Sequence, residues 1–127
     1  MSQIETVFEY NGEKFEFDVR DADDAEKFED AINDLSEAEK SAPKDGKAST
    51  QIRITCRAIK QFFDTCLGNG AGEKICGEKD NVAPHYDAYE KFIELVRLQR
   101  NDILATKNTF AKYSNRSQRR NAEKQKK

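Results

Sequence analysis

IETVFEYNGEKFEFDV, residues 4–19, decides the first part of the fold. Asn11 and Gly12 can supply the two positive-φ positions of a type I′ turn, and β-branched and aromatic residues flank them on both sides. With these two residues as the loop, Phe8 faces Phe15, and nearly all the larger apolar side chains share one face. Two strands alone are marginal in water. We therefore predict a β-hairpin whose apolar face is covered by helices or by strands of another subunit.

Three amphipathic helices are predicted after the hairpin, over about residues 22–40, 50–67 and 83–113. Each range places its apolar residues at a period near 3.6. The first helix starts at an acidic cap and ends before Pro43, the second ends at a run of glycines, and the third has Pro84 in its first turn. The sequence thus predicts an α+β fold, mainly α, in which an N-terminal β-hairpin precedes three helices, the last one long.

The length of 127 residues suits one domain. We predict that residues 1–113 form it and that residues 114–127, which lack apolar periodicity, are a disordered basic tail. Charge is distributed unevenly, because residues 1–50 carry a net charge of −9 and residues 112–127 carry +6. Such asymmetry bears on partners and association rates more than on the fold.

Side chains suited to catalysis are scarce. The single histidine, His85, excludes most triad and zinc arrangements, and we expect it at the surface or in a helix cap. The cysteines at 56, 66 and 76 lack C-x-x-C spacing, so we expect reduced, buried thiols. The glycine-rich stretch 68–72 lacks the lysine of a phosphate-binding loop and is interpreted as a linker followed by a short turn. We predict no catalytic residue, no metal site and no cofactor, hence a protein that is not an enzyme.

The sequence carries no sign of a membrane or export segment. Its apolar runs fall short of the roughly 18 residues that a membrane helix needs. Its first residues also lack the basic and apolar regions of a signal peptide. We expect a cytosolic protein with no membrane partner.

The third predicted helix is the candidate binding element. Its roughly 28 residues would measure about 42 Å, more than a domain of this size needs. We expect its first half to be core and its second half to project. An apolar stripe longer than one core requires can receive another helix. The residues that we predict to contact a partner are Tyr89, Phe92, Val96, Ile103 and Phe110.

The basic tail is a second candidate binding element. Its main cationic residues are Arg116, Arg119, Arg120, Lys124, Lys126 and Lys127. They could neutralise phosphates, which makes nucleic acid a candidate partner. The tail has no aromatic residue beyond Tyr113 to stack on bases, and an acidic protein surface would serve it equally well. We therefore place a protein partner, or a tail that is simply solvated, ahead of nucleic acid.

Two stretches also carry a family resemblance. GEKDN (77–81) leads into a helix containing YEKFI (89–93), and KYSNRSQRR (112–120) contains an Asn-Arg-x-x-Arg-Arg pattern. Together with the layout of the chain, they resemble short proteins of phages and prophages of Gram-positive bacteria that are regarded as tail assembly chaperones. The Asn-Arg-x-x-Arg-Arg pattern looks like the endings common in those proteins.

The resemblance implies a helical, non-enzymatic protein of the host bacterial cytoplasm. Such a protein would coat hydrophobic parts of the tape-measure protein and help to recruit the major tail protein during tube growth. We expect a homo-oligomer or a complex formed through the third helix. The alternative is a small phage nucleic-acid-binding or packaging accessory protein that acts through its basic tail.

Overall fold

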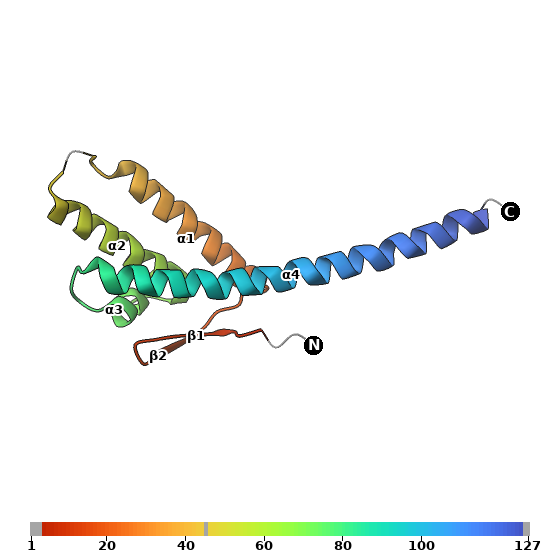
Figure 1. Ribbon diagram of the computed structural model, residues 1–127, viewed down its shortest axis with the longest axis horizontal. Helices are drawn as coiled ribbons and strands as arrows, with labels where there is room; N and C mark the ends of the chain where they lie inside the picture. The colour runs from red at the N-terminus through yellow and green to blue at the C-terminus, as the bar shows by residue number, and fades with distance from the viewer. Residues whose placement is uncertain (1–3, 45, 126–127) are drawn as a thin grey trace.

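The computed structural model describes the backbone of residues 4–44 and 46–125, and side chains up to residue 114. The elements are β1 (Val7–Tyr10), β2 (Glu13–Glu16), α1 (Ala22–Ser41), α2 (Ala48–Leu67), α3 (Ala71–Cys76) and α4 (Val82–Gln125). Figure 1 shows α1 and α2 as neighbouring helices, with the first half of α4 packed on them and the hairpin on the other side of α4. The second half of α4 projects from this body. The predicted mainly helical α+β fold is confirmed.

The hairpin has the predicted turn and register. Asn11 and Gly12 adopt φ values of 56° and 81°, as a type I′ turn requires. Phe8 pairs with Phe15 in the antiparallel ladder. The turn chemistry therefore fixed which side chains share the inner face.

The ladder is shorter than the predicted hairpin of residues 4–19. Its last bond runs from the N–H of Phe17 to the carbonyl of Thr6, at 2.8 Å. The next inner residue, Val19, donates its N–H to the side chain of Gln99 and not to the first strand. A polar side chain of α4 thus replaces the end of the ladder.

Phe92 of α4 lies at the centre of the core. Its ring centroid is 5.0–6.5 Å from those of five other phenylalanines, which are Phe8, Phe17, Phe28, Phe62 and Phe63. Several of these contacts are edge-to-face, a favourable geometry for aromatic pairs. The rings come from the hairpin, α1 and α2, so one side chain joins all the main elements. Helices of the same chain therefore cover the hairpin.

The first two helices lie close to their predicted positions. Asp21 caps α1 by accepting a hydrogen bond from the N–H of Asp23 at 2.9 Å, as the acidic start of this helix predicted. Helix α2 begins at Ala48, two residues before the prediction. Its N-cap, Lys47, makes no side-chain capping bond, so no cap residue marked this boundary in the sequence.

Helix α3 replaces the predicted linker and turn. Its six residues are mostly buried, and Gly72 packs so closely on α2 that a side chain there would collide with the backbone of Lys60. The N–H of Gly72 donates to the carboxylate of Asp64 at 2.8 Å. Part of the glycine run is therefore needed for close packing of α3 on α2. The composition alone had indicated only a flexible linker.

The last helix is longer than predicted. We expected it over 83–113, whereas α4 continues to Gln125. The disorder predicted for residues 114–127 stays a prediction, because the structure describes only the backbone of residues 115–125, and residues 126–127 lie outside the described residues. Eight of the twelve residues 114–125 are good helix formers (arginine, glutamine, alanine, glutamate and lysine), the others are serine and asparagine, and none is glycine or proline. Local propensity therefore favours a helix here although the segment has no apolar face to bury.

Candidate functional site

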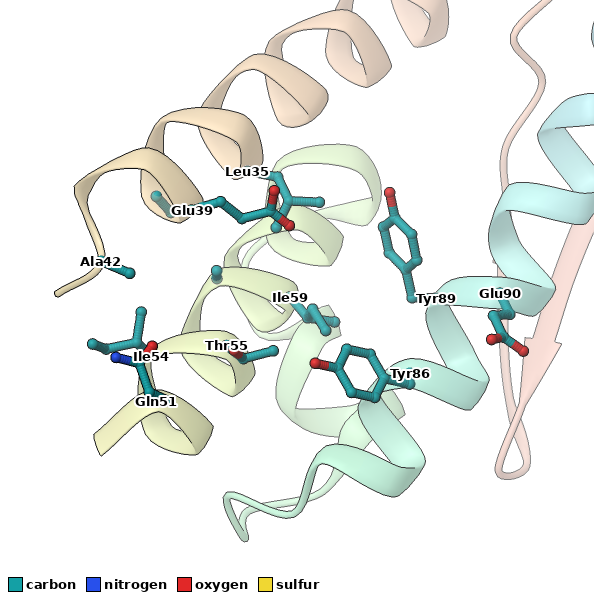
Figure 2. A pocket seen from close by; sticks show the side chains of 12 residues that line it. Leu35, Glu39, Ala42, Gln51, Ile54, Thr55, Ile59, Tyr86, Tyr89 and Glu90 are labelled. Carbon is teal, nitrogen blue, oxygen red and sulfur yellow. The ribbon is translucent and has the colours of Figure 1, made fainter. Parts of the chain in front are cut away.

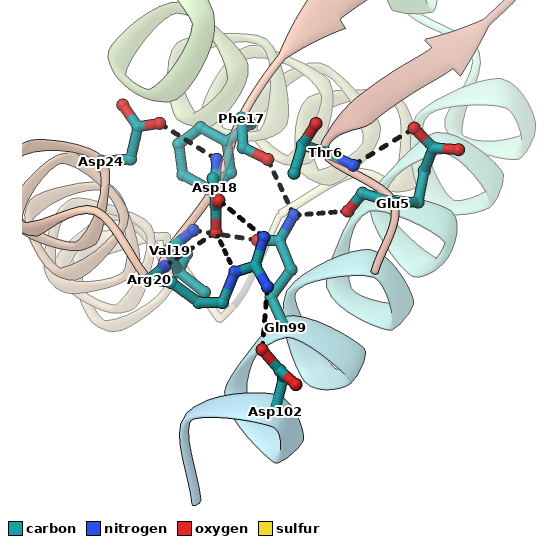
Figure 3. Close-up of polar contacts among 9 residues, drawn as sticks. All are labelled: Glu5, Thr6, Phe17, Asp18, Val19, Arg20, Asp24, Gln99 and Asp102. Carbon is teal, nitrogen blue, oxygen red and sulfur yellow. Dashed lines mark hydrogen bonds and ion pairs between the residues drawn. The ribbon is translucent and has the colours of Figure 1, made fainter. Parts of the chain in front are cut away.

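Gln99 marks the point where α4 leaves the body. Its fully buried side-chain oxygen accepts a hydrogen bond from the N–H of Val19 at 2.9 Å. Its amide nitrogen donates to the carbonyls of Phe17 at 2.8 Å and Glu5 at 2.9 Å. Figure 3 shows this amide between the two chain segments that flank the hairpin. Within the part of α4 whose side chains are described, Gln99 is the last buried residue.

An ion-pair cluster follows one turn later. The guanidinium of Arg20 bonds Asp18 and Asp102, each at 2.8 Å (Figure 3). The hydrogen bond to Arg20 lowers the pKa of the Asp18 carboxyl, and the two carboxylates raise the pKa of Arg20. Exposed pairs of this kind contribute little stability individually. They do tie the start of α1 to α4 just before the helix projects.

We call α4 from Ile103 to Gln125 the arm. Ile103 and Phe110 stand seven and fourteen residues after Val96 and so continue the face that packs into the core. Phe110 is 74% exposed and Tyr113, three residues on, is 65% exposed. The core-facing stripe of α4 therefore runs on without cover from the described part of the chain.

The structure divides the five residues predicted to contact a partner. Phe92 and Val96 are buried in the protein's own core, so the prediction that a partner contacts them needs correcting. They lie where the hairpin and α2 already cover α4. Tyr89 is partly buried, while Ile103 and Phe110 are exposed on the arm. The predicted basic residues from Arg116 onward have side chains outside the described residues.

A groove lies at the opposite end of the molecule from the arm. It has a volume of about 420 Å³ and lies between α1, α2 and the first turns of α4. Figure 2 shows Tyr86 and Tyr89 facing it from α4. The apolar and aromatic side chains that form its walls include Leu35, Ala38, Ile54, Ala58, Tyr86 and Tyr89. Its size is that of a pocket which can receive several apolar side chains.

Sequence reasoning missed this groove. One available signal was that Tyr86 and Tyr89 are three residues apart on α4 and lie to one side of the face centred on Phe92. Tyr86 is 50% exposed. Tyr89 was predicted to contact a partner, but the first half of this helix was predicted to be core and Tyr86 was not named among the contact residues. The separation between α1 and α4 that leaves them uncovered depends on tertiary packing.

The groove and the arm have opposite electrostatic character. Glu39 and Glu90 are among the groove's lining residues, and none of the lining residues is basic. The first 50 residues, which include α1, carry 15 acidic and six basic side chains. The arm, residues 103–125, carries six basic side chains and one acidic side chain, a net charge of +5. Each molecule therefore presents an acidic body and a basic arm.

His85 is fully buried, so its predicted surface position is wrong. Its Nδ1 lies 2.6 Å from the carbonyl oxygen of Asn81 and must donate, because a carbonyl only accepts. Nε2 is then an acceptor without a partner among the described residues. Burial lowers the pKa of His85. The neutral imidazole is therefore the form that fits this site.

The cysteines are buried and unbridged, as predicted. Burial raises the pKa of Cys66 to about 12 and that of Cys76 to about 11. The thiolate is the reactive form of cysteine, so these thiols are poor nucleophiles in the folded chain. Among the described residues, no three or more histidine, cysteine or carboxylate side chains are placed to hold a metal ion.

Comparisons with known proteins identify a family but no characterised relative. No curated protein and no solved structure matches the chain. Within the described residues, no helix is both long enough and apolar enough to cross a membrane. A family model matches residues 11–123, from the hairpin turn to the last turns of α4. The chain therefore belongs to the family described as "Family of unknown function (DUF6673)".

Proposed function

We propose that this protein is a non-enzymatic phage tail assembly chaperone of the host bacterial cytoplasm. It would bind helical segments of the tape-measure protein, the major tail protein, or both, during tail formation. The uncovered apolar stripe of the arm is the observation that supports this proposal. The resemblance of residues 77–81, 89–93 and 112–120 to proteins of that class supplies the identity of the client.

The arm has the chemistry of a helix-binding surface. Ile103, Phe110 and Tyr113 follow one another along one side of α4 at spacings of seven and three residues. An amphipathic client helix could pack its apolar face against them. Burying one large apolar side chain contributes about 1.5–3 kcal/mol. A few such contacts suit transient binding, and the charged remainder of the chain would keep a complex in solution.

Coexpression with the tape-measure protein encoded at the same locus tests the proposal. We expect a higher soluble yield of the tape-measure protein and a complex that copurifies. The variant Phe110→Glu should lose both effects, because it places a charge in the stripe. Leu104→Glu is the matched control, since Leu104 is also exposed on the arm but lies off the stripe. An unchanged yield without copurification would count against a chaperone of tail proteins.

The charge of the arm supports a second candidate, a phage nucleic-acid-binding or packaging accessory protein. Eight basic side chains follow Asp102, enough to neutralise several phosphates. This function predicts a gel shift that weakens steeply with salt and is lost when residues 114–127 are removed. Absence of binding at low salt would exclude it. The chaperone proposal predicts that Phe110 matters, whereas phosphate binding depends on the basic side chains.

A further inference from the structure

The groove and the arm cannot meet within one molecule. Tyr86 and Tyr89 line the groove from the first turns of α4. Phe110 stands 21 residues after Tyr89, about 32 Å further along the same continuous helix. Figure 1 shows the arm leaving the body on the side opposite the α1–α2 connection, near which the groove lies. If an arm occupies the groove, that arm must therefore belong to another molecule.

We propose that the arm of one copy docks in the groove of a second copy. The apolar stripe of the arm, with Ile103 and Phe110, would face the apolar walls between α1 and α2. Lys107, one turn after Ile103, would approach the carboxylates of Glu39 and Glu90 at the groove. Burial of the stripe would supply the attraction, and the opposite charges would orient the arm. This contact does not depend on whether the client is a tail protein.

Charge selects this arrangement over pairing between two arms. A pair of arms would bring two segments of +5 together, whereas an arm beside a body places +5 against the −9 of the first 50 residues. Like charges facing one another suppress association, and complementary charges favour it. Most helical stability in proteins comes from tertiary packing, so cover from a second copy would also stabilise the arm. A copy of the same chain therefore suits the groove in both apolar character and charge.

The proposed contact has a distinctive symmetry. Each molecule would use two different surfaces, its arm and its groove, so the contact is head-to-tail. Head-to-tail contacts build chains or closed rings, whereas a two-fold dimer uses the same patch twice. The mean mass in solution should accordingly rise with concentration unless a ring closes at a fixed number of copies. Either result differs from a monomer and from a dimer formed by two arms.

Sedimentation and light scattering of the full chain, without any client, test the contact. Phe110→Glu places a charge in the apolar stripe of the arm, and Ala58→Arg fills and charges the groove. Each should weaken self-association by about tenfold to a hundredfold. Leu104→Glu and Gln61→Arg are exposed controls on the same two helices and should associate like the wild type. Far-ultraviolet circular dichroism checks that each variant is folded. If Ala58→Arg fails to fold, Tyr86→Arg, at a half-exposed position, takes its place.

Mixing the two defective variants gives the decisive result. Phe110→Glu keeps an intact groove and Ala58→Arg keeps an intact arm, so together they should form a 1:1 heterodimer that cannot grow further. A wild type that stays monomeric at all concentrations would overturn the proposal, as would a mixture that stays monomeric. Self-association that survives Ala58→Arg and Tyr86→Arg would instead indicate pairing between arms. Because no tail protein is present, these outcomes are independent of the proposed chaperone function.

Discussion

The variant Gln99→Leu should destabilise the protein strongly, although leucine has a similar size and favours helices. The substitution leaves three backbone groups without their partner: the N–H of Val19 and the carbonyls of Phe17 and Glu5. The bonds to Val19 and Phe17 are buried, while the one to Glu5 is only partly so and its carbonyl can turn to water. At about 1.5 kcal/mol for each buried group, the free energy of unfolding should fall by about 3 kcal/mol. That is a large part of the roughly 5–15 kcal/mol typical of a domain.

Urea denaturation followed by circular dichroism measures this loss. Gln61→Leu, the same substitution at an exposed position of α2, is the control and should change the unfolding free energy by less than about 0.5 kcal/mol. Hydrogen exchange at the Val19 amide gives a local readout, because that proton should exchange much faster in Gln99→Leu. The reasoning would be refuted by equal stabilities of the two variants, or by unchanged exchange at Val19.

Three further predictions concern the core and its titratable groups. Phe92→Ala should lower the unfolding free energy by about 3–5 kcal/mol, whereas Phe110→Ala in dilute protein should change it by less than about 0.5 kcal/mol; urea titration compares the two. Because burial holds the pKa of His85 below its ordinary 6.5, the unfolded chain binds more protons as the pH falls. The free energy of unfolding should therefore fall from about pH 7 toward pH 5, and it should fall less steeply in His85→Gln. Urea titration of both proteins at each pH measures this dependence. With thiol pKa values of about 12 for Cys66 and about 11 for Cys76, a thiol reagent at pH 8 should label the folded protein slowly and the urea-unfolded chain rapidly.

Local chemistry made much of the fold predictable. Asn11 and Gly12 specified the turn and therefore the register of the hairpin, because few other residue pairs adopt those φ values. The acidic cap at Asp21 located the start of α1. In the same way, the 3.6-residue period predicted that α1 has one apolar face, and the buried Phe28 lies on that face. Each of these features depends on residues close together in the sequence.

The features that sequence reasoning missed depend on distant residues. Val19 bonds Gln99 across 80 positions, so no local pattern could show where the ladder ends. His85 is buried because the first turns of α4, to which it belongs, pack against α2 and α3, although its neighbours in sequence suggested a helix start at the surface. The groove arises where α1 and α4 diverge beside Tyr86. Such features arise from tertiary packing, so periodicity and composition could not predict them.

The continuity of α4 gives the arm a definite rotational phase. Each residue turns the helix by about 100° and advances it by about 1.5 Å, so the direction of Phe110 is set by its residue count from Phe92. Inserting one alanine after Asp102 would swing the whole stripe by about a quarter of a turn without removing any side chain. Inserting seven would return the stripe to nearly its original direction about 10 Å further out. A partner bound to the arm is thus held in one direction around the helix axis relative to the body. Comparing the two insertions would show whether binding depends more on that direction or on the distance from the body.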